Sequence, residues 1–245
     1  MEVGSCRLCG RDEPLVQSHI VPRAFFEIGR KQDLKLVSNV AGQYPKKSPI
    51  GVYDHIMCDS CEKSFSDYDA YAAKTLIQDL STYRKVMFQG RLLALVADKI
   101  DYQLLKLFSI SLLWRASVSR HGFYKRVQIG PLEEKARGML LSRHPGTENE
   151  FASWWSVFDM NWSPAIMDPF RERWSGVTAY RFYLGRVLAY IKADGRSVPS
   201  DFREIAIGPR KGLVMVARDF EKSKDRDAIL GLLRTAVRGK NGLFP

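Results

Sequence analysis

The segments Cys6-Arg7-Leu8-Cys9 and Cys58-Asp59-Ser60-Cys61 contain all four cysteines of this chain. A spacer of two residues allows both thiolates of a pair to bind one tetrahedral ion. Two such pairs form a closed four-thiolate site without an open coordination position, which is typical of structural zinc. The pattern therefore predicts a structural Zn²⁺ ion held by Cys6, Cys9, Cys58 and Cys61.

The composition favours a globular protein with a basic surface. The chain has 245 residues, of which 45% are hydrophobic, so it can form a substantial core. It carries 38 Lys and Arg residues against 27 Asp and Glu residues, which gives a formal net charge of +11. Such an excess favours a polyanionic partner, either nucleic acid or a membrane surface. A basic surface without a polyanionic partner is the alternative interpretation.

The sequence predicts a cytoplasmic protein that does not enter a membrane. Its first residues lack the basic segment and the apolar stretch of a secretory signal. The most apolar stretch, Leu104 to Trp114, is interrupted by Lys106 and is too short to span a bilayer. In a reducing compartment, paired cysteines favour metal binding over disulfides.

Two regions of the chain differ in their patterns. Residues 1–67 form a small four-cysteine module, and residues 68–245 form an α+β body with helices first and an antiparallel sheet after them. The spacing of apolar residues predicts helices at 64–83, 101–119, 131–142 and 225–238, and strands at 151–158, 176–191, 205–207 and 213–217. The last two strands flank a Gly-Pro-Arg-Lys-Gly turn, which predicts a hairpin.

The segments Ser18-His19-Ile20-Val21-Pro22 and Met57-Cys58-Asp59-Ser60-Cys61-Glu62 lie between and around the cysteine pairs. In these motifs the chain resembles the HNH (His-Me finger) endonucleases. Many members of that family flank a ββα-metal motif with two Cys-x-x-Cys pairs, and their first strand ends in His-Ile-x-Pro. The resemblance covers about the first seventy residues. It implies a treble-clef zinc module with a ββα core.

The resemblance implies that His19 is the general base that activates water. It also implies a second ion, Mg²⁺ or Mn²⁺, at the scissile phosphate. Glu62 stands where the family has a histidine, and its carboxylate is expected to bind this ion. Ser18 replaces the usual Asp or His and is a poor ligand. The middle Asn of the family has no match, because Tyr53 to His55 occupy its neighbourhood and Asn39 is only a distant substitute.

Both candidate catalytic residues also have a structural interpretation. His19 can be a histidine that stabilises the fold near the zinc knuckle. Glu62 can be an acid in the first turn of a helix, where it favours the helix macrodipole. One turn further on, Ser66 and Asp67 are alternative ligands, although Asp67 is more typical of a solvated helix acid.

Basic clusters and tryptophans provide further candidate contacts to nucleic acid. Single basic clusters are more often solvated faces, and one residue of an adjacent tryptophan pair on a strand is expected in the core. The candidate phosphate contacts are Arg115, Arg120, Lys125 and Arg126, then Arg210 and Lys211, then Arg234, Arg238 and Lys240, and the candidate stacking residues are Trp154, Trp155 and Trp162.

The leading hypothesis is an HNH-like, metal-dependent endonuclease that acts on DNA rather than RNA. The body would bind substrate or a protein partner, and the resemblance alone suggests a role in restriction, mobile elements or phage defence. The second hypothesis is a catalytically degenerate treble-clef zinc protein that binds nucleic acid or a protein without cleavage, which Ser18 and the missing Asn favour. The third is an interaction or inhibitor module in which zinc only stabilises the fold.

Overall fold

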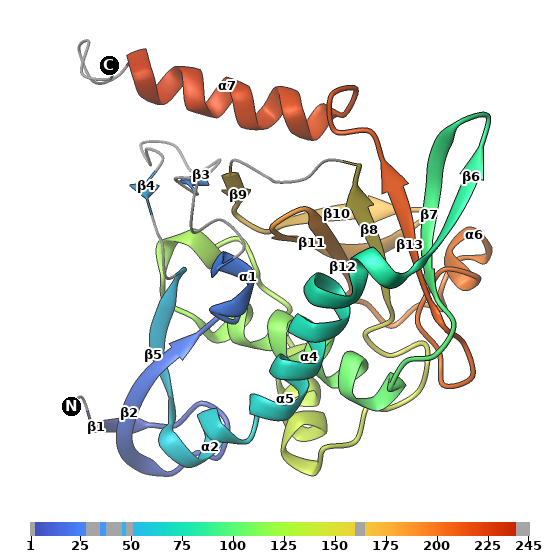
Figure 1. Ribbon diagram of the computed structural model, residues 1–245. Helices are drawn as coiled ribbons and strands as arrows, with labels where there is room; N and C mark the ends of the chain where they lie inside the picture. The colour runs from blue at the N-terminus through green and yellow to red at the C-terminus, as the bar shows by residue number, and fades with distance from the viewer. Residues whose placement is uncertain (1–2, 28–34, 38–45, 48–50, 160–164, 239–245) are drawn as a thin grey trace.

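The computed structural model describes residues 3–27, 35–37, 46–47, 51–159 and 165–238 (Figure 1). This part of the chain is an α+β structure, as the sequence predicts. It contains a three-stranded sheet, a seven-stranded sheet and a small sheet of β4 (Lys46–Lys47), β3 (Lys35–Val37) and β9 (Ala165–Met167). None of the helices in the described ranges is long and apolar enough to cross a membrane.

The N-terminal sheet has the order β1-β2-β5, formed by β1 (Val3–Ser5), β2 (Asp12–His19) and β5 (Tyr53–Cys58). Strand β2 pairs with β5 in antiparallel orientation, with Leu15 opposite Cys58 and His19 opposite Tyr53. Strand β5 continues directly into helix α2 (Asp59–Lys63). The second cysteine pair therefore lies at one end of a β-β-α unit, and His19 lies at the other end of its first strand.

The predicted helices are present with small changes at their ends. The helix predicted at 64–83 already begins with α2 and continues as α3 (Ser66–Ala73), the π-helical η1 (Lys74–Gln78) and the 3₁₀ turn η2 (Asp79–Thr82). The other three are α4 (Tyr102–Val118), α5 (Leu132–Ser142) and α7 (Lys224–Arg238). Asp101 caps α4 because its carboxylate accepts a 3.0 Å hydrogen bond from the Leu104 N–H.

The large sheet has the order β10-β11-β12-β8-β13-β7-β6. Its neighbours are antiparallel except for β8 and β13, which are parallel and which the sequence did not predict as partners. Two strands that precede α4 also join it, so the body is not strictly helices followed by strands. The strands are β6 (Arg84–Phe88), β7 (Arg91–Ala97), β8 (Ser153–Phe158), β10 (Phe170–Trp174), β11 (Val177–Leu184), β12 (Val187–Lys192) and β13 (Leu213–Arg218).

The hairpin predicted around Gly208 to Gly212 is wrong. Residues 205–207 follow the short helix α6 (Ser200–Arg203) and form no strand, while β13 pairs with β7 and β8. A Cβ atom on Gly212 would lie 2.1 Å from the carbonyl oxygen of Ala97. This glycine therefore allows β13 to approach β7 closely instead of forming a hairpin turn.

Helix α4 lies between the N-terminal sheet and the large sheet (Figure 1). Phe108 on α4 stacks on Phe25 of α1 (Ala24–Glu27), with ring centroids 5.7 Å apart, and on Trp155 of β8, at 6.3 Å. The buried apolar side chains of both regions thus form one continuous cluster. The division into 1–67 and 68–245 stays a prediction.

A buried carboxylate fixes helix α7 on the large sheet. Asp225, which is 2% exposed, lies 2.8 Å from nitrogens of Arg181 on β11 and of Arg218 on β13. The hydroxyl of Tyr183 donates to the same carboxylate at 2.5 Å. Removal of one partner of a buried ion pair strongly destabilises a protein, because the other charge is left uncompensated. The carboxylate of Asp225 therefore holds α7 in place.

A second buried ion pair connects the N-terminal sheet to the body. The guanidinium of Arg115 on α4 is 0% exposed and donates to both carboxylate oxygens of Asp69 on α3, at 2.7 and 2.9 Å. It also donates to the carbonyl of His19 at 3.0 Å. The prediction that Arg115 contacts phosphates is wrong, because its charge is buried and bound within the protein.

We expect Asp69→Asn to lower the free energy of unfolding by about 3–5 kcal/mol, since it leaves the charge of Arg115 buried without the carboxylate to which it is hydrogen-bonded. Urea unfolding followed by circular dichroism measures this. Asp67→Asn is the matched control on the same helix, because its ion pair with Arg143 is about half exposed. The control should change stability by about 1 kcal/mol or less. Equal losses in both variants would contradict the role given to Arg115.

Candidate metal centre and histidine site

The first cysteine pair lies on the turn between β1 and β2. The N–H of Gly10 donates to the carbonyl of Cys6 at 2.8 Å, and Gly10 has a φ of +79°, a conformation that glycine adopts without steric cost. The N–H of Arg7 donates to the carbonyl of Ile56 at 2.9 Å, next to a β-bulge that the register of β2 and β5 reveals. These bonds place the turn beside the end of β5.

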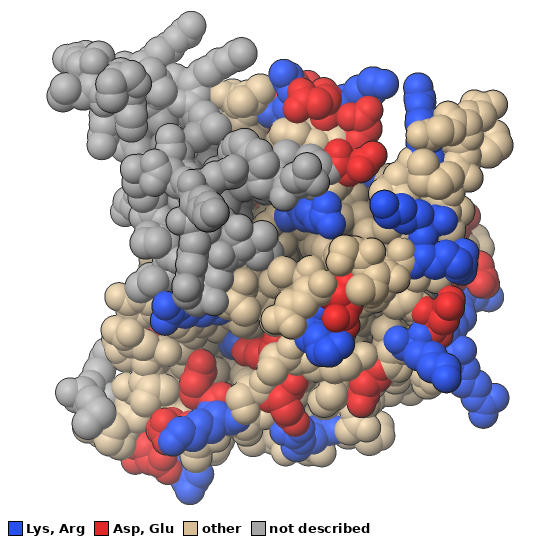
Figure 2. Space-filling view, in the orientation of Figure 1, with Lys and Arg blue, Asp and Glu red and all other residues tan. Residues whose placement is uncertain are grey.

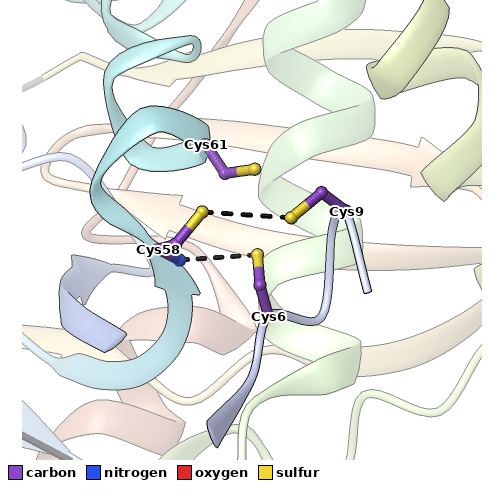
Figure 3. A group of neighbouring side chains, drawn as sticks. All are labelled: Cys6, Cys9, Cys58 and Cys61. Atoms are coloured by element: carbon purple, nitrogen blue, oxygen red, sulfur yellow. Dashed lines mark hydrogen bonds between the residues drawn. The ribbon is translucent and has the colours of Figure 1, made fainter. Parts of the chain in front are cut away.

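The second pair lies where β5 becomes α2, and the four sulfur atoms point toward one another (Figure 3). They all lie within 4.8 Å of one another, and the sulfurs of Cys9 and Cys58 are 3.9 Å apart. A tetrahedral ion with Zn–S bonds of about 2.3 Å requires sulfurs about 3.8 Å apart. The four cysteines can therefore hold a metal ion, as predicted, and in the described part of the chain no other group of three His, Cys, Asp or Glu residues is so arranged.

The protonation of these thiols depends on their surroundings. Burial raises the pKa of Cys6 and of Cys61. Burial also acts to raise the pKa of Cys9, but hydrogen bonds from Arg11 and the neighbouring cysteines outweigh it and lower this pKa to about 6. Because the thiolate is the ligand, binding of a metal releases protons and weakens in acid.

A second cluster of polar side chains lies around the end of β2. The imidazole of His19 has its centroid 6.1 Å from that of Tyr53. Burial raises the pKa of the Glu62 carboxyl, while the charge of Arg115, the Ser18 hydroxyl and the backbone N–H of His19 act to lower it. Glu62 therefore lies against Ser18 and His19, so the structure brings together the residues that the motif singled out.

Asp69 and Arg115 belong to the same cluster, which the sequence did not indicate. Burial raises the pKa of the Asp69 carboxyl, and the charges of Arg115 and His19 act in the opposite direction. Glu62 and Asp69 therefore face one guanidinium. Asp69 follows Glu62 by seven residues, about two helical turns, and this spacing could have indicated that both acids lie on one face. No sequence pattern indicates Arg115, because it is far from both acids along the chain.

Asp54 connects strand β5 to the end of α4. Its carboxylate accepts hydrogen bonds from the Ser119 hydroxyl at 2.9 Å, the Arg120 N–H at 2.7 Å and the His55 N–H at 2.8 Å. These bonds outweigh the effect of burial and lower the pKa of Asp54. Asp54 therefore fixes β5 against the end of α4.

Other candidate ligands lie outside the two clusters. His55 is exposed on β5 and is not part of the cysteine group. The Ser66 hydroxyl donates to the carbonyl of Lys63, and Asp67 pairs with Arg143 at the surface, as expected of a solvated helix acid. Asn39 lies outside the described residues.

Trp154 and Trp155 are 3% and 0% exposed, so both lie in the core, where one of the pair was expected, and neither can stack on a base. Trp154 stacks on Phe202 of α6 with centroids 4.9 Å apart, whereas Trp155 faces Phe108 of α4. The sheet is thus covered on both sides here. Trp162, Lys240 and the side chains of Arg234 and Arg238 lie outside the described part. Of the other basic candidates, Lys211 donates to the Arg203 carbonyl, and Arg120, Lys125, Arg126 and Arg210 are exposed.

Comparison with protein-family models, with curated proteins and with solved structures finds no match to this chain. Any assignment of function therefore depends on the motif residues and on the geometry of the two clusters.

Purified protein should contain one zinc ion per chain, and X-ray absorption should show four sulfur neighbours at about 2.3 Å. Cys61→Ser should lose most of this zinc and unfold at a lower temperature, because a structural metal contributes to folding. Ser60→Ala is the matched control, since its hydroxyl lies 3.3 Å from the Cys58 sulfur but is not part of the ligand set. Retention of full zinc by Cys61→Ser would contradict the site.

Proposed function

We propose that this chain is an HNH-like, metal-dependent endonuclease that cleaves DNA. The observation that supports this best is the β-β-α unit of β2, β5 and α2. It carries a four-cysteine cluster at its base, His19 at the end of its first strand, and Glu62 of its helix against the backbone of His19. This is the arrangement that the resemblance to the HNH endonucleases implies.

In this proposal the four cysteines hold a structural Zn²⁺ ion, which fixes the first turn of α2 relative to β2. His19 acts as the general base that takes a proton from the attacking water. Its backbone is fixed by the 3.0 Å hydrogen bond from Arg115 to its carbonyl, and its ring lies near Tyr53. The strand thus presents the imidazole at a fixed position.

Glu62 is the residue that would hold a catalytic Mg²⁺ or Mn²⁺ ion. Its buried Oε2 atom has no hydrogen-bond partner among the described residues, and a cation would satisfy it. A single carboxylate gives the ion only one protein ligand. Mg²⁺ is commonly held by one or two carboxylates, with water and phosphate oxygens in its other coordination positions. When bound, the ion would stabilise the negative charge that develops on the scissile phosphate.

The second candidate function is nucleic-acid binding without cleavage, and Arg115 favours it. Its guanidinium bonds both oxygens of Asp69 and acts on the charge of Glu62. A buried positive charge is therefore already present beside these two acids. It opposes the entry of a divalent cation, because like charges repel strongly where water is excluded.

Cleavage of supercoiled plasmid with added Mg²⁺ or Mn²⁺ tests the proposal. We expect nicking by zinc-loaded protein, and a loss of roughly 100-fold or more in His19→Ala, since a positioned general base contributes about that much. Glu62→Gln should raise the metal concentration needed for half-maximal cleavage. His144→Ala is the matched control, because that histidine is exposed outside both clusters. A folded, zinc-loaded protein that binds DNA without cutting it would support the second candidate instead.

A further inference from the structure

The hairpin of β6 and β7 projects beyond the large sheet (Figure 1). Strand β13 pairs with β7 at Ala94 to Ala97, whereas Arg91 and Leu92 pair only with β6 among the described strands. Gln89 and Gly90 connect the two strands with φ angles of +47° and +75°. Two positive φ angles are those of a type I′ turn, whose twist matches that of a two-stranded ribbon. The end of the hairpin is therefore a narrow, defined projection rather than a long loop.

The tip of this hairpin is apolar although it is exposed. Phe88 is 60% exposed, Met87 is 53% exposed and Leu93 is 46% exposed. They are three of the six large hydrophobic side chains that are exposed in the part of the chain that the structure describes. Exposed apolar side chains that gather in one place mark interaction sites, whereas single scattered ones need no explanation.

The same hairpin carries only positive charge. Arg84, Lys85 and Arg91 are exposed, and residues 84–97 contain no Asp or Glu. Arg84 lies 3.7 Å from Asp98 at the base of the hairpin, but both side chains are more than half exposed, so water weakens this pair. Lys85 and Arg91 form no ion pair with a described residue. The charge of the hairpin therefore fits a polyanion.

The position of Arg91 favours DNA over a lipid surface. Arg91 lies directly across from Phe88 in the register of β6 and β7, so the guanidinium and the ring share one face of the tip. Insertion of this ring into a bilayer would carry the guanidinium with it, which costs free energy. A DNA groove accepts both, because arginine contacts the groove while an apolar side chain wedges between base pairs. A two-stranded ribbon is also narrow enough to enter a groove.

A second copy of the chain fits this hairpin less well than DNA does. It would bring another surface of the same positive charge against Arg84 and Lys85. Charged side chains, lysine above all, protect the edge strand of a sheet from pairing with another chain.

We propose that the β6–β7 hairpin is a DNA-binding arm that enters a groove, with Phe88 as a wedge between base pairs and Lys85 and Arg91 on the phosphates. The proposal rests on DNA as the partner in the proposed function, but not on cleavage. In Figure 1 the hairpin and the unit of β2, β5 and α2 lie on opposite sides of the molecule. The arm therefore contacts the duplex away from the proposed general base. A bend at the wedge allows one duplex to follow the protein surface between them.

The overall charge does not direct DNA to one place by itself. On the face seen in Figure 2, Lys and Arg side chains are interspersed with Asp and Glu rather than gathered in one patch. At the upper right, where the hairpin ends, the projecting side chains are blue or tan. A local arm is needed to position a duplex, because phosphate contacts set its register on the protein.

The test is binding of duplex DNA at several salt concentrations, measured by fluorescence anisotropy in buffer without added divalent ions. A duplex labelled at both ends reports bending through energy transfer. We expect Arg91→Gln to weaken binding and to reduce the salt slope by about 1, the effect of one lost phosphate contact. Phe88→Ala should weaken binding roughly tenfold, as expected for one lost stacking contact, and should abolish the bend without changing the salt slope.

Leu141→Ala and Arg173→Gln are the matched controls. Leu141 is an exposed apolar residue on α5, and Arg173 is an exposed arginine on β10, the strand at the opposite edge of the sheet. Both variants should bind and bend DNA as the wild-type protein does. Phosphatidylcholine vesicles with and without phosphatidylserine test the lipid alternative, and sedimentation velocity tests the second copy.

Unchanged affinity and bending in Phe88→Ala and Arg91→Gln would overturn the arm, as would equal losses in the two controls, which indicate diffuse charge attraction. A loss of vesicle binding or of dimers in Phe88→Ala, without an effect on DNA, would overturn it in favour of that partner. Failure of the wild-type protein to bind DNA would overturn both the arm and DNA as the substrate. Bending that depends on Phe88, in a protein that does not cleave with Mg²⁺, would support the arm and refute only the nuclease.

Discussion

The four cysteine sulfurs lie within 4.8 Å of one another, and the geometry of the histidine site depends on this cluster. Cys58 ends β5 and Cys61 lies in the first turn of α2, so the cluster fixes that helix against the turn between β1 and β2. The residue after Cys61 is Glu62, which this contact directs toward Ser18 and His19. A short helix of five residues is not stable alone, so its position depends on this cluster and on packing.

The buried guanidinium of Arg115 is the second constraint on the histidine site. It connects α4 to Asp69 and to the backbone of His19, so the histidine site is assembled from both regions of the chain. The same buried charge opposes a divalent cation beside Glu62. In the proposed nuclease, one residue would therefore both fix the backbone of the general base and weaken the metal site at Glu62.

Features encoded locally could be predicted from the sequence, whereas those made by distant residues could not. The Cys-x-x-Cys spacing and the apolar helix predicted at 101–119 follow from the geometry of single segments. The Asp69–Arg115 pair joins residues 46 positions apart, so no local pattern reveals it. The alternation of side chains along a strand predicts one of the two tryptophans of β8 at the surface. In the structure, α6 covers one face of the sheet and α4 the other, so both Trp154 and Trp155 are buried. Gly212 looked like a turn residue because its close contact with Ala97 is invisible in the sequence.

The most direct test of the nuclease account is anomalous diffraction from crystals of the zinc-loaded protein soaked in Mn²⁺. The account predicts one zinc peak equidistant from the four cysteine sulfurs and a manganese peak at the carboxylate of Glu62, beside His19. A zinc peak without any manganese peak near Glu62, with Arg115 still facing that carboxylate, would contradict it.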